Sequence, residues 1–397
     1  MVSVSEQYEA YPYPERDPSD EAKRLITGSP SHPLEMDHFL WEGRRDWSQP
    51  LRILVAGGGT GDGLIQLAQV LTSAGKPYDI TYVDLSTASR AVAEARAQAR
   101  GLTGITFHTG SLLDAPDYGQ FDYIDCCGVL HHLPDPAEGF AALRKALAPG
   151  GGLGFMVYAP YGRSGVYPLQ EAFGTLFDGL PPQDRLAKAK EIVTNLPAGH
   201  PFAVNPHLTD HRQSDAGFYD LLLHGQDRAF DVGDLLAVLD QTGWRLQSFC
   251  TPALYDLSRI ASRPEGMGDG EAMAVAEKLR GTIKLHAAYA VPSDDLRKPA
   301  KGSNRQLIPH LRGVQPRALA QAVAQGKPLP INMGGVSERV TLPKDAAPLI
   351  AAIDGRRALA QIAEATRTDP LRFGALWGAL DKHLTAWGLM LYSTLGR

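Results

Sequence analysis

The stretch Leu51-Arg-Ile-Leu-Val-Ala-Gly-Gly-Gly-Thr-Gly-Asp-Gly63 decides the fold of this chain. Its apolar run breaks into glycines and leads to an amphipathic segment, Leu64 to Leu71, which predicts a strand, a tight turn and a helix. Glycine permits positive φ and lets a ligand lie against bare main chain, and the helix that follows offers unpaired N–H groups. The stretch therefore predicts a site for a nucleotide-like ligand.

Short apolar runs alternate with helical patterns after this turn, which predicts an α/β fold with a doubly wound, seven-stranded and mostly parallel sheet. Strands are expected near Arg52–Ala56, Asp79–Asp84, Ile105–His108, Tyr123–Cys127, Leu153–Tyr158, Arg245–Thr251 and Thr282–Val291. Helices are expected near Gly61–Ala74, Thr87–Arg100, Pro136–Ala148, Pro182–Leu196, Val232–Thr242 and Gly270–Leu279.

The pattern divides the chain into four parts. Residues 1–50 are expected to form an arm or lid, and residues 51–292 the α/β domain, whose irregular segment 159–230 reads as an insertion on the substrate side. Residues 293–306 are typical of a linker. Residues 307–397 predict a small, mainly helical module of winged-helix type, with helices at Pro348–Ile353, Ala358–Ala365 and Phe373–Leu391.

The composition excludes several classes of protein. A hydrophobic fraction of 44%, a charged fraction of 21% and a net charge of -5 are ordinary for a soluble protein and show no basic excess for nucleic acid. No apolar run approaches the ~18 residues of a membrane helix, and the acidic, proline-broken N-terminus does not resemble a signal peptide. Cys126, Cys127 and Cys250 lack CxxC spacing, which argues against disulfides and structural zinc. We expect a cytoplasmic protein.

The glycine turn does not fit a dinucleotide fingerprint, because Asp62 takes the place of the third glycine. What fits is glycine at positions 57, 59 and 61, followed by Asp84 at the end of the second expected strand. A carboxylate at that place can accept both hydroxyls of a ribose. The alternative is that the glycines only shape the turn and Asp84 helps to cap the next helix.

Five ordered motifs resemble those of the class I S-adenosylmethionine-dependent methyltransferases, and the resemblance covers roughly Leu51 to Val291. They are Val55-Ala-Gly-Gly-Gly-Thr-Gly61, Asp84, Gly110-Ser-Leu-Leu-Asp-Ala-Pro116, Phe121-Asp-Tyr-Ile-Asp-Cys-Cys-Gly-Val-Leu-His-His-Leu-Pro-Asp135 and Leu147-Ala-Pro-Gly-Gly151. The resemblance implies a methyltransferase with S-adenosyl-L-methionine as cofactor. It places at the cofactor Gly57, Gly58, Gly59, Gly61, Asp84, Leu85, Ser111, Leu112, Cys127 and Gly128.

Two positions depart from the family pattern. Val55 stands where the family usually has an acidic residue two before the first glycine, so the network at the methionine end must be built otherwise. Ser111 stands where an Asp often contacts the adenine amine, a contact that its hydroxyl or Asp114 could replace.

The loop after the fourth expected strand offers the catalytic candidates. His131 and His132 follow Cys127 and Gly128, and an imidazole that titrates near neutrality can deprotonate an acceptor. The alternative for each histidine is structural packing.

Four tyrosines are candidates for contacts with substrate. Tyr8, Tyr11 and Tyr13, in a proline-stiffened segment, are expected to form a lid, or else to pack the arm onto the core. Tyr219, in the insertion, is expected to contact the acceptor, with Asp227-Arg228 nearby.

Another group resembles a metal site at first sight: His207, His211 and His224, with Asp210 and Asp215. Pro206 and the polar surroundings do not establish the helix that would bring His207 and His211 together, so we expect no metal.

The sequence therefore predicts methyl transfer to an oxygen or nitrogen nucleophile of a small molecule. One alternative is a protein side chain presented through the C-terminal module. Another is a non-catalytic regulatory protein that binds S-adenosylmethionine. Nucleic acid and membrane partners are not expected, and a homodimer is compatible with the pattern.

Overall fold

One seven-stranded sheet organises the computed structural model, which describes residues 4–397, so residues 1–3 of the expected arm lie outside it. The strand order is β3-β2-β1-β4-β5-β7-β6, and β7 runs antiparallel to both of its neighbours. This confirms the predicted doubly wound, mostly parallel sheet. The strands are β1 (Leu51–Ala56), β2 (Tyr78–Asp84), β3 (Ile105–Thr109), β4 (Phe121–Cys127), β5 (Leu147–Tyr158), β6 (Trp244–Phe249) and β7 (Leu285–Pro292).

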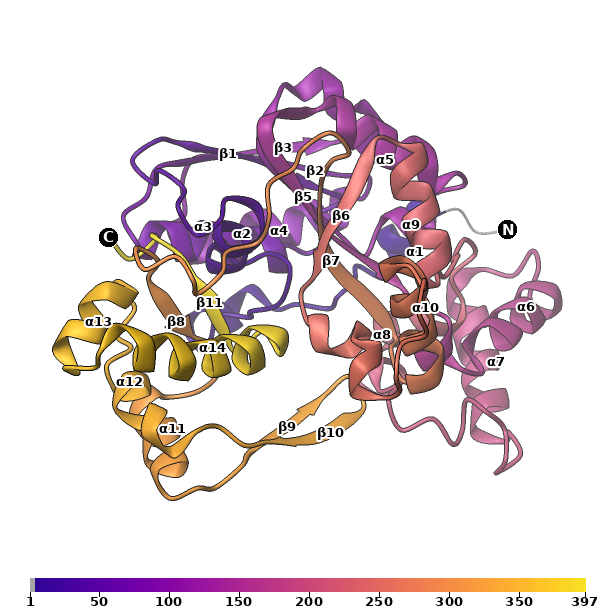
Figure 1. Cartoon of the computed structure of the whole chain (residues 1–397). Helices are drawn as coiled ribbons and strands as arrows, with labels where there is room; N and C mark the ends of the chain where they lie inside the picture. The colour runs from indigo at the N-terminus through magenta and orange to yellow at the C-terminus, as the bar shows by residue number, and fades with distance from the viewer. Residues whose placement is uncertain (1–3) are drawn as a thin grey trace.

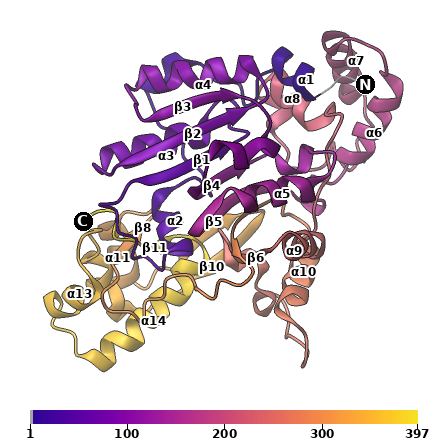
Figure 2. The same ribbon diagram turned by 90° about the horizontal axis from the view of Figure 1, so that it is seen from above.

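Helices cover both faces of the sheet because successive strand side chains point to opposite sides. On β1, Ile53 and Val55 face the core beneath α2 (Pro33–Leu40), α3 (Asp62–Ser73) and α4 (Thr87–Ala99), whereas Leu54 faces the opposite core. That second core lies beneath α5 (Pro136–Lys145) and α9 (Val232–Gln241), and α10 (Asp269–Arg280) packs beside α9. Figure 2 shows α3 and α5 on opposite sides of the strands.

Residues 159–230 leave the sheet after β5 and build a separate cluster of helices. These are α6 (Val166–Leu176), α7 (Pro182–Thr194) and α8 (Asp215–Leu222). They bury their own apolar core, which includes Phe173 and Phe218. The N-terminal helix α1 (Val4–Ala10) is connected to this cluster through a hydrogen bond from the Tyr8 hydroxyl to Asp220.

The C-terminal region has its own core and lies on the side of the sheet away from α6 and α7 (Figure 1). Its last residues return to α2, where Asp37 accepts hydrogen bonds from the Ser393 hydroxyl at 2.7 Å and the Thr394 N–H at 2.9 Å. Its elements are β8 (Pro309–Leu311), α11 (Pro316–Ala324), β9 (Leu329–Met333), β10 (Val336–Val340), α12 (Ala347–Ala351), α13 (Leu359–Ala365), α14 (Pro370–Ala386) and β11 (Met390–Tyr392).

Three local expectations differ from the structure. The helix expected to reach Ala148 ends at Lys145. Strand β5 begins already at Leu147 and continues through the glycines. At Gly152 and Gly154, the side chains of Leu40 and Tyr123 leave no space for a Cβ. The last expected helix ends at Ala386, because Gly388 turns the chain with φ +65° into β11. Helix α11 and the β9–β10 hairpin were not predicted, although the Gly-Gly pair at 334–335 is a hairpin signal.

None of the helices in the described part of the chain is both long enough and apolar enough to span a bilayer.

Candidate functional site

The glycine turn between β1 and α3 presents bare main chain. Gly57, Gly59 and Gly61 have φ of +70°, +51° and +98°, values that favour glycine. A Cβ on Gly57 would lie 2.5 Å from the side chain of Val129, so no other residue fits that turn. The N–H of Gly57 donates to the Val83 carbonyl at 2.8 Å and ties the turn to the end of β2.

Asp84 stands at the end of β2 beside this turn. Its two carboxylate oxygens accept the N–H of Gly59 at 2.7 Å and the N–H of Ser86 at 2.9 Å. Each oxygen retains a second acceptor position, and the side chain lines the cavity described below. Burial raises the pKa of Asp84, and a hydrogen-bond donor from a ligand would favour its ionised form. Glycine cradle and carboxylate together fit a nucleoside with its ribose.

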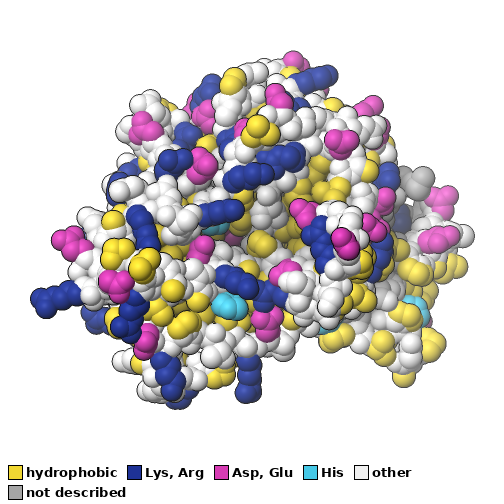
Figure 3. Space-filling model, viewed as in Figure 1, with side chains coloured by type: hydrophobic (Ala, Val, Ile, Leu, Met, Phe, Trp, Pro, Cys, Tyr) yellow, Lys and Arg dark blue, Asp and Glu magenta, His cyan; other side chains and the backbone are white. Residues whose placement is uncertain are grey.

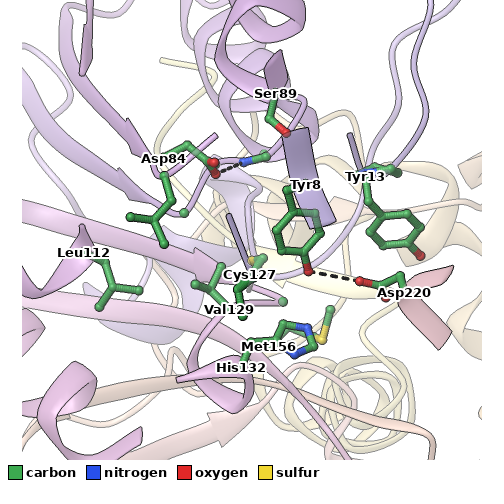
Figure 4. Close-up of a pocket in the computed structure, with 18 of the residues that line it drawn as sticks. Tyr8, Tyr13, Asp84, Ser89, Leu112, Cys127, Val129, His132, Met156 and Asp220 are labelled. Carbon is green, nitrogen blue, oxygen red and sulfur yellow. Dashed lines mark hydrogen bonds between the residues drawn. The ribbon is translucent and has the colours of Figure 1, made fainter. Parts of the chain in front are cut away.

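A cavity of about 490 Å³ begins at this turn and continues past the end of β4 to the insertion (Figure 4). The structure thus brings together residues that are far apart in the sequence. The predicted site residues that line it are Tyr8, Tyr13, Gly57, Gly58, Gly59, Asp84, Leu85, Ser111, Leu112, Cys127, Gly128 and His132.

Four predicted site residues lie outside the cavity lining. Gly61 is the N-cap of α3, and a Cβ there would lie 3.0 Å from the Cβ of Ala93. Tyr11 stacks on Tyr219 with ring centroids 5.1 Å apart, so this pair packs the arm onto the insertion. His131 lies behind His132, with its ring centroid 4.0 Å from that of Tyr158.

The N-terminal arm closes one side of the cavity. Arg16 binds Asp62 through two hydrogen bonds of 2.9 and 2.6 Å, and the Thr60 hydroxyl donates to the Pro14 carbonyl at 2.6 Å. The Ser86 hydroxyl donates to the Tyr8 carbonyl at 3.2 Å. These contacts tie the arm to the glycine turn and to the start of α4, and its role as a lid stays a prediction.

The methionine end of the predicted cofactor site contains a carboxylate despite Val55. Asp125 on β4 lines the cavity and accepts hydrogen bonds from the Tyr123 hydroxyl and the Cys127 thiol, each at 3.2 Å. A Cβ on Gly63 would lie 3.2 Å from Oδ1 of Asp125, so the carboxylate stands beside the start of α3. Burial raises the pKa of Asp125, so a cationic partner would be needed to stabilise its charged form.

A buried group of polar side chains forms the opposite end of the cavity. The Tyr8 hydroxyl donates to one oxygen of Asp220 at 3.0 Å, as Figure 4 shows, and the Tyr158 hydroxyl donates to the other at 2.9 Å. His132 and His224 stack beside them with ring centroids 3.7 Å apart. Of these five residues, Tyr8, Tyr158, Asp220 and His132 line the cavity.

Two groups of described residues place possible metal ligands within 4.8 Å of one another: His131 with His132 and Asp227, and His132 with Asp220 and His224. The Arg163 guanidinium lies 3.3 Å from Asp227 and already provides it with a positive charge. Asp220 is held by its two tyrosines. The expected absence of a metal stays a prediction.

Among the described residues, no group of possible metal ligands combines His207, His211 and His224. His224 belongs to the cavity group, and His211 packs against Phe202. The ring of His207 lies close to Gly335, at the tip of the β9–β10 hairpin.

Several cavity residues were missed in the sequence: Arg16, Asp125, Met156, Tyr158, Arg163, Asp220 and Gln226. Met156 and Tyr158 could have been found, because they end the strand beside β4, and ligands of such sheets lie at the carboxyl ends of strands. Asp220 and Gln226 belong to the insertion, whose path no local pattern indicates.

Comparison with known proteins connects this site with one class of enzyme. Residues 54–153 match the family model of a methyltransferase domain. An uncharacterized protein of Synechococcus sp. is 34% identical over 273 residues, which are 67% of this chain and 64% of the relative. The ubiquinone biosynthesis O-methyltransferase of Psychrobacter arcticus is 34% identical over 96 residues, 23% of this chain and 36% of that enzyme. The chain therefore matches less than two thirds of either relative's length.

A solved structure shares the fold over most of the chain. PKMT2 from Rickettsia typhi, in complex with AdoHcy, matches with a TM-score of 0.63 over 91% of this chain and 75% of that protein. Its sequence identity is 14%, so the likeness concerns the fold.

Proposed function

We propose that the chain transfers a methyl group from S-adenosylmethionine to an oxygen or nitrogen of a small-molecule acceptor, because residues 54–153 match the model of a methyltransferase domain and the sheet has the class I strand order. The observation that supports this most strongly is the shared cavity. The glycine turn and Asp84 form one end, and Tyr8, His132 and Asp220 form the other. Its volume of about 490 Å³ lies within the range typical of small-molecule sites.

The main task of the chain's residues is to bind and align donor and acceptor. The donor, when bound, supplies an electrophilic methyl group on a sulfonium. The glycine main chain and Asp84 are placed to hold its nucleoside, and residues of the arm and insertion form other walls of the cavity. Alignment of donor and acceptor supplies much of the rate enhancement available to a displacement reaction.

The position of the C-terminal region favours a small acceptor over a protein side chain. Among the described residues, those that line the cavity end at Leu285, before the C-terminal region begins. On the face seen in Figure 3, Lys and Arg side chains are interspersed with Asp and Glu, which does not form an extended basic surface for nucleic acid.

The test uses the purified protein, S-adenosylmethionine labelled in its methyl group, and an extract from a strain that lacks the gene. We expect label in the small-molecule fraction and formation of the demethylated product. Label in protein would support the side-chain alternative instead. Donor binding without any product would support a non-catalytic role.

A calorimetric control accompanies this test. Asp84→Ala is expected to abolish binding of S-adenosylhomocysteine, because Asp84 both faces the cavity and holds the N–H of Gly59. Failure of the unaltered protein to bind S-adenosylhomocysteine would overturn the proposed function.

A further inference from the structure

The tautomer of His132 is fixed by one hydrogen bond. Its Nδ1 lies 2.8 Å from the backbone carbonyl of Gln226, and a carbonyl only accepts, so Nδ1 carries the proton. The neutral ring therefore has its lone pair on Nε2. That nitrogen is buried and has no hydrogen-bond partner within the described residues, although His132 lines the cavity. A buried acceptor of this kind requires a donor, and the cavity is where a substrate would supply one.

The neighbouring His224 is held in the opposite tautomer by the same residue. The N–H of Gln226 donates to His224 Nδ1 at 3.1 Å, so the neutral ring of His224 carries its proton on Nε2. That Nε2 lies 3.3 Å from the Tyr8 hydroxyl, which in turn donates to Asp220. His224 therefore has no free lone pair, and His132 alone of the stacked pair can accept a proton from a substrate.

The surroundings disfavour a positive charge on His224. Burial and the proximity of His132 hold the pKa of His224 well below its usual value. Burial raises the pKa of Asp220. A positive charge on His132 would oppose that rise, because an imidazolium attracts a buried carboxylate. The titratable or charged groups around His132 are Tyr8, His131, Tyr158, Arg163, Asp220, His224 and Asp227.

The walls of this end of the cavity indicate the acceptor's chemistry. Tyr8, Tyr13, Tyr158 and Met156 present aromatic and apolar surface, which suits a flat ring. The Arg163 guanidinium lies over the ring of Tyr158 at 3.7 Å and also lines the cavity, but Asp227 pairs with it and the Asp220 carboxylate stands at the same end, so this end has no unpaired excess of either charge for an acceptor to match. A neutral hydroxyl on an aromatic ring fits both conditions, and its proton must be removed for efficient attack.

We propose that His132 is the general base that deprotonates a phenolic hydroxyl of the acceptor, with Gln226, His224 and Asp220 as positioning residues. This inference rests on the proposed function. The hydroxyl proton moves to Nε2 of His132 as the acceptor oxygen bonds to the methyl carbon. The carbon–sulfur bond breaks, its electron pair stays on sulfur, and the positive charge lost by the sulfonium appears on the imidazolium, which later releases its proton to water.

The kinetic test compares two phenols. His132→Asn keeps an amide N–H that can reach the Gln226 carbonyl but lacks Nε2. With p-cresol, which is neutral at mildly alkaline pH, we expect a loss of about 10²–10⁴-fold in kcat. With p-nitrophenol, which is ionised there, the loss should be much smaller. His211→Asn is the matched control, because His211 lies outside the cavity lining. Equal losses on both phenols would overturn the base role, and no turnover of either phenol by a protein that binds S-adenosylhomocysteine would overturn the acceptor class.

The role of Asp220 has its own readout. In Asp220→Asn the imidazolium of His132 loses a buried anion, so the acidic limb of the kcat/KM profile should move to lower pH. A purely structural role would reduce activity without moving that limb.

A spectroscopic test does not depend on turnover. In ¹⁵N-histidine spectra of the full chain, with and without S-adenosylhomocysteine, we expect a proton on Nδ1 of His132 and on Nε2 of His224. The His132→Asn spectrum assigns the signals. The reverse tautomer, or a ring of His132 already protonated at neutral pH, would overturn the inference even if methyl transfer occurs. Failure of donor binding would overturn the proposed function while these spectra still report on His132.

Discussion

Val55 on β1 lies in register with Asp125 on the neighbouring strand β4. In the methyltransferases that this chain resembles, the position of Val55 usually carries an acid. Here the carboxylate that lines the cavity at this end comes from the adjacent strand, and it stands beside Gly63 at the start of α3. The chain thus retains a carboxylate at the site while Val55 packs into the apolar core.

Asp125→Asn should weaken donor binding. The substitution keeps the size of the side chain and removes the charge that would pair with the ammonium group of the donor. A hydrogen bond to a charged group contributes about 1.5–3 kcal/mol, so calorimetry with S-adenosylhomocysteine should show about a tenfold to hundredfold higher Kd. Asp122→Asn, on the same strand but paired with Arg52 outside the cavity, is the control and should leave Kd unchanged. An unaltered Kd in Asp125→Asn would contradict a role in binding.

Arg16→Gln should loosen the arm. The Arg16 guanidinium forms two hydrogen bonds with Asp62, and both side chains are partly exposed, so the loss should be about 1 kcal/mol or less. We expect release of S-adenosylhomocysteine, measured by stopped flow, to accelerate by about fivefold or less. Lys23→Gln removes an exposed ion pair with Asp20 and should not change the release rate. A slower release in Arg16→Gln would show that the arm does not hold the ligand in.

Arg312→Met should destabilise the chain. The Arg312 guanidinium pairs with Glu35 in α2, whose side chain is 1% exposed, and so connects the C-terminal region to the first core. Removing one partner of a fully buried ion pair typically costs about 3–5 kcal/mol, and because the Arg312 side chain is 35% exposed we expect a smaller loss, which urea denaturation can measure. Glu35→Gln added to Arg312→Met should recover part of the loss, because no buried charge remains. Arg372→Met, from an exposed pair with Asp345, should cost about 1 kcal/mol or less.

Acid should destabilise the folded chain partly through His38. Burial lowers the pKa of this histidine to about 3, and its Nδ1 accepts the Tyr392 N–H at 3.2 Å. In the unfolded state this histidine has its ordinary pKa of ~6.5, so the unfolded state binds the proton first as the pH falls. The free energy of unfolding therefore decreases as the pH drops from about 6.5 toward about 3. His38→Asn, which keeps an acceptor for Tyr392, should show a shallower decline of the urea midpoint between pH 7 and pH 5. An identical decline would assign the acid sensitivity to other groups.

The sheet and its cofactor end could be predicted because their signals are local. The glycines of the turn need positive φ, and Asp84 follows a strand whose apolar pattern is plain, so both were identified from residue type and spacing. The expected helix Phe373–Leu391 continues too far, because its apolar pattern runs through Trp387 although Gly388 marks the end of α14 locally. That residues 390–392 then pair with β8 is a tertiary contact that the local pattern does not specify.

The acceptor end of the cavity could be predicted only in part. His132 was a candidate because it follows β4, but nothing in the pattern separated it from His131. The structure separates them: the Gln226 carbonyl accepts the Nδ1 proton of His132, while His131 packs behind it against Tyr158. Tyr11 and Tyr13 are also alike in sequence, yet Tyr13 lines the cavity and Tyr11 stacks on Tyr219.

The sequence by itself determined the strands and helices of the sheet domain, the glycine turn and the position of Asp84 at the end of β2, since backbone conformation and strand periodicity depend on neighbouring residues. Only the tertiary structure decided which carboxylate lies beside Val55, which of the two loop histidines lines the cavity, and which tyrosines face it. Those outcomes depend on contacts between segments far apart in the chain, such as Tyr8 with Asp220 and His132 with Gln226, and no local pattern specifies them.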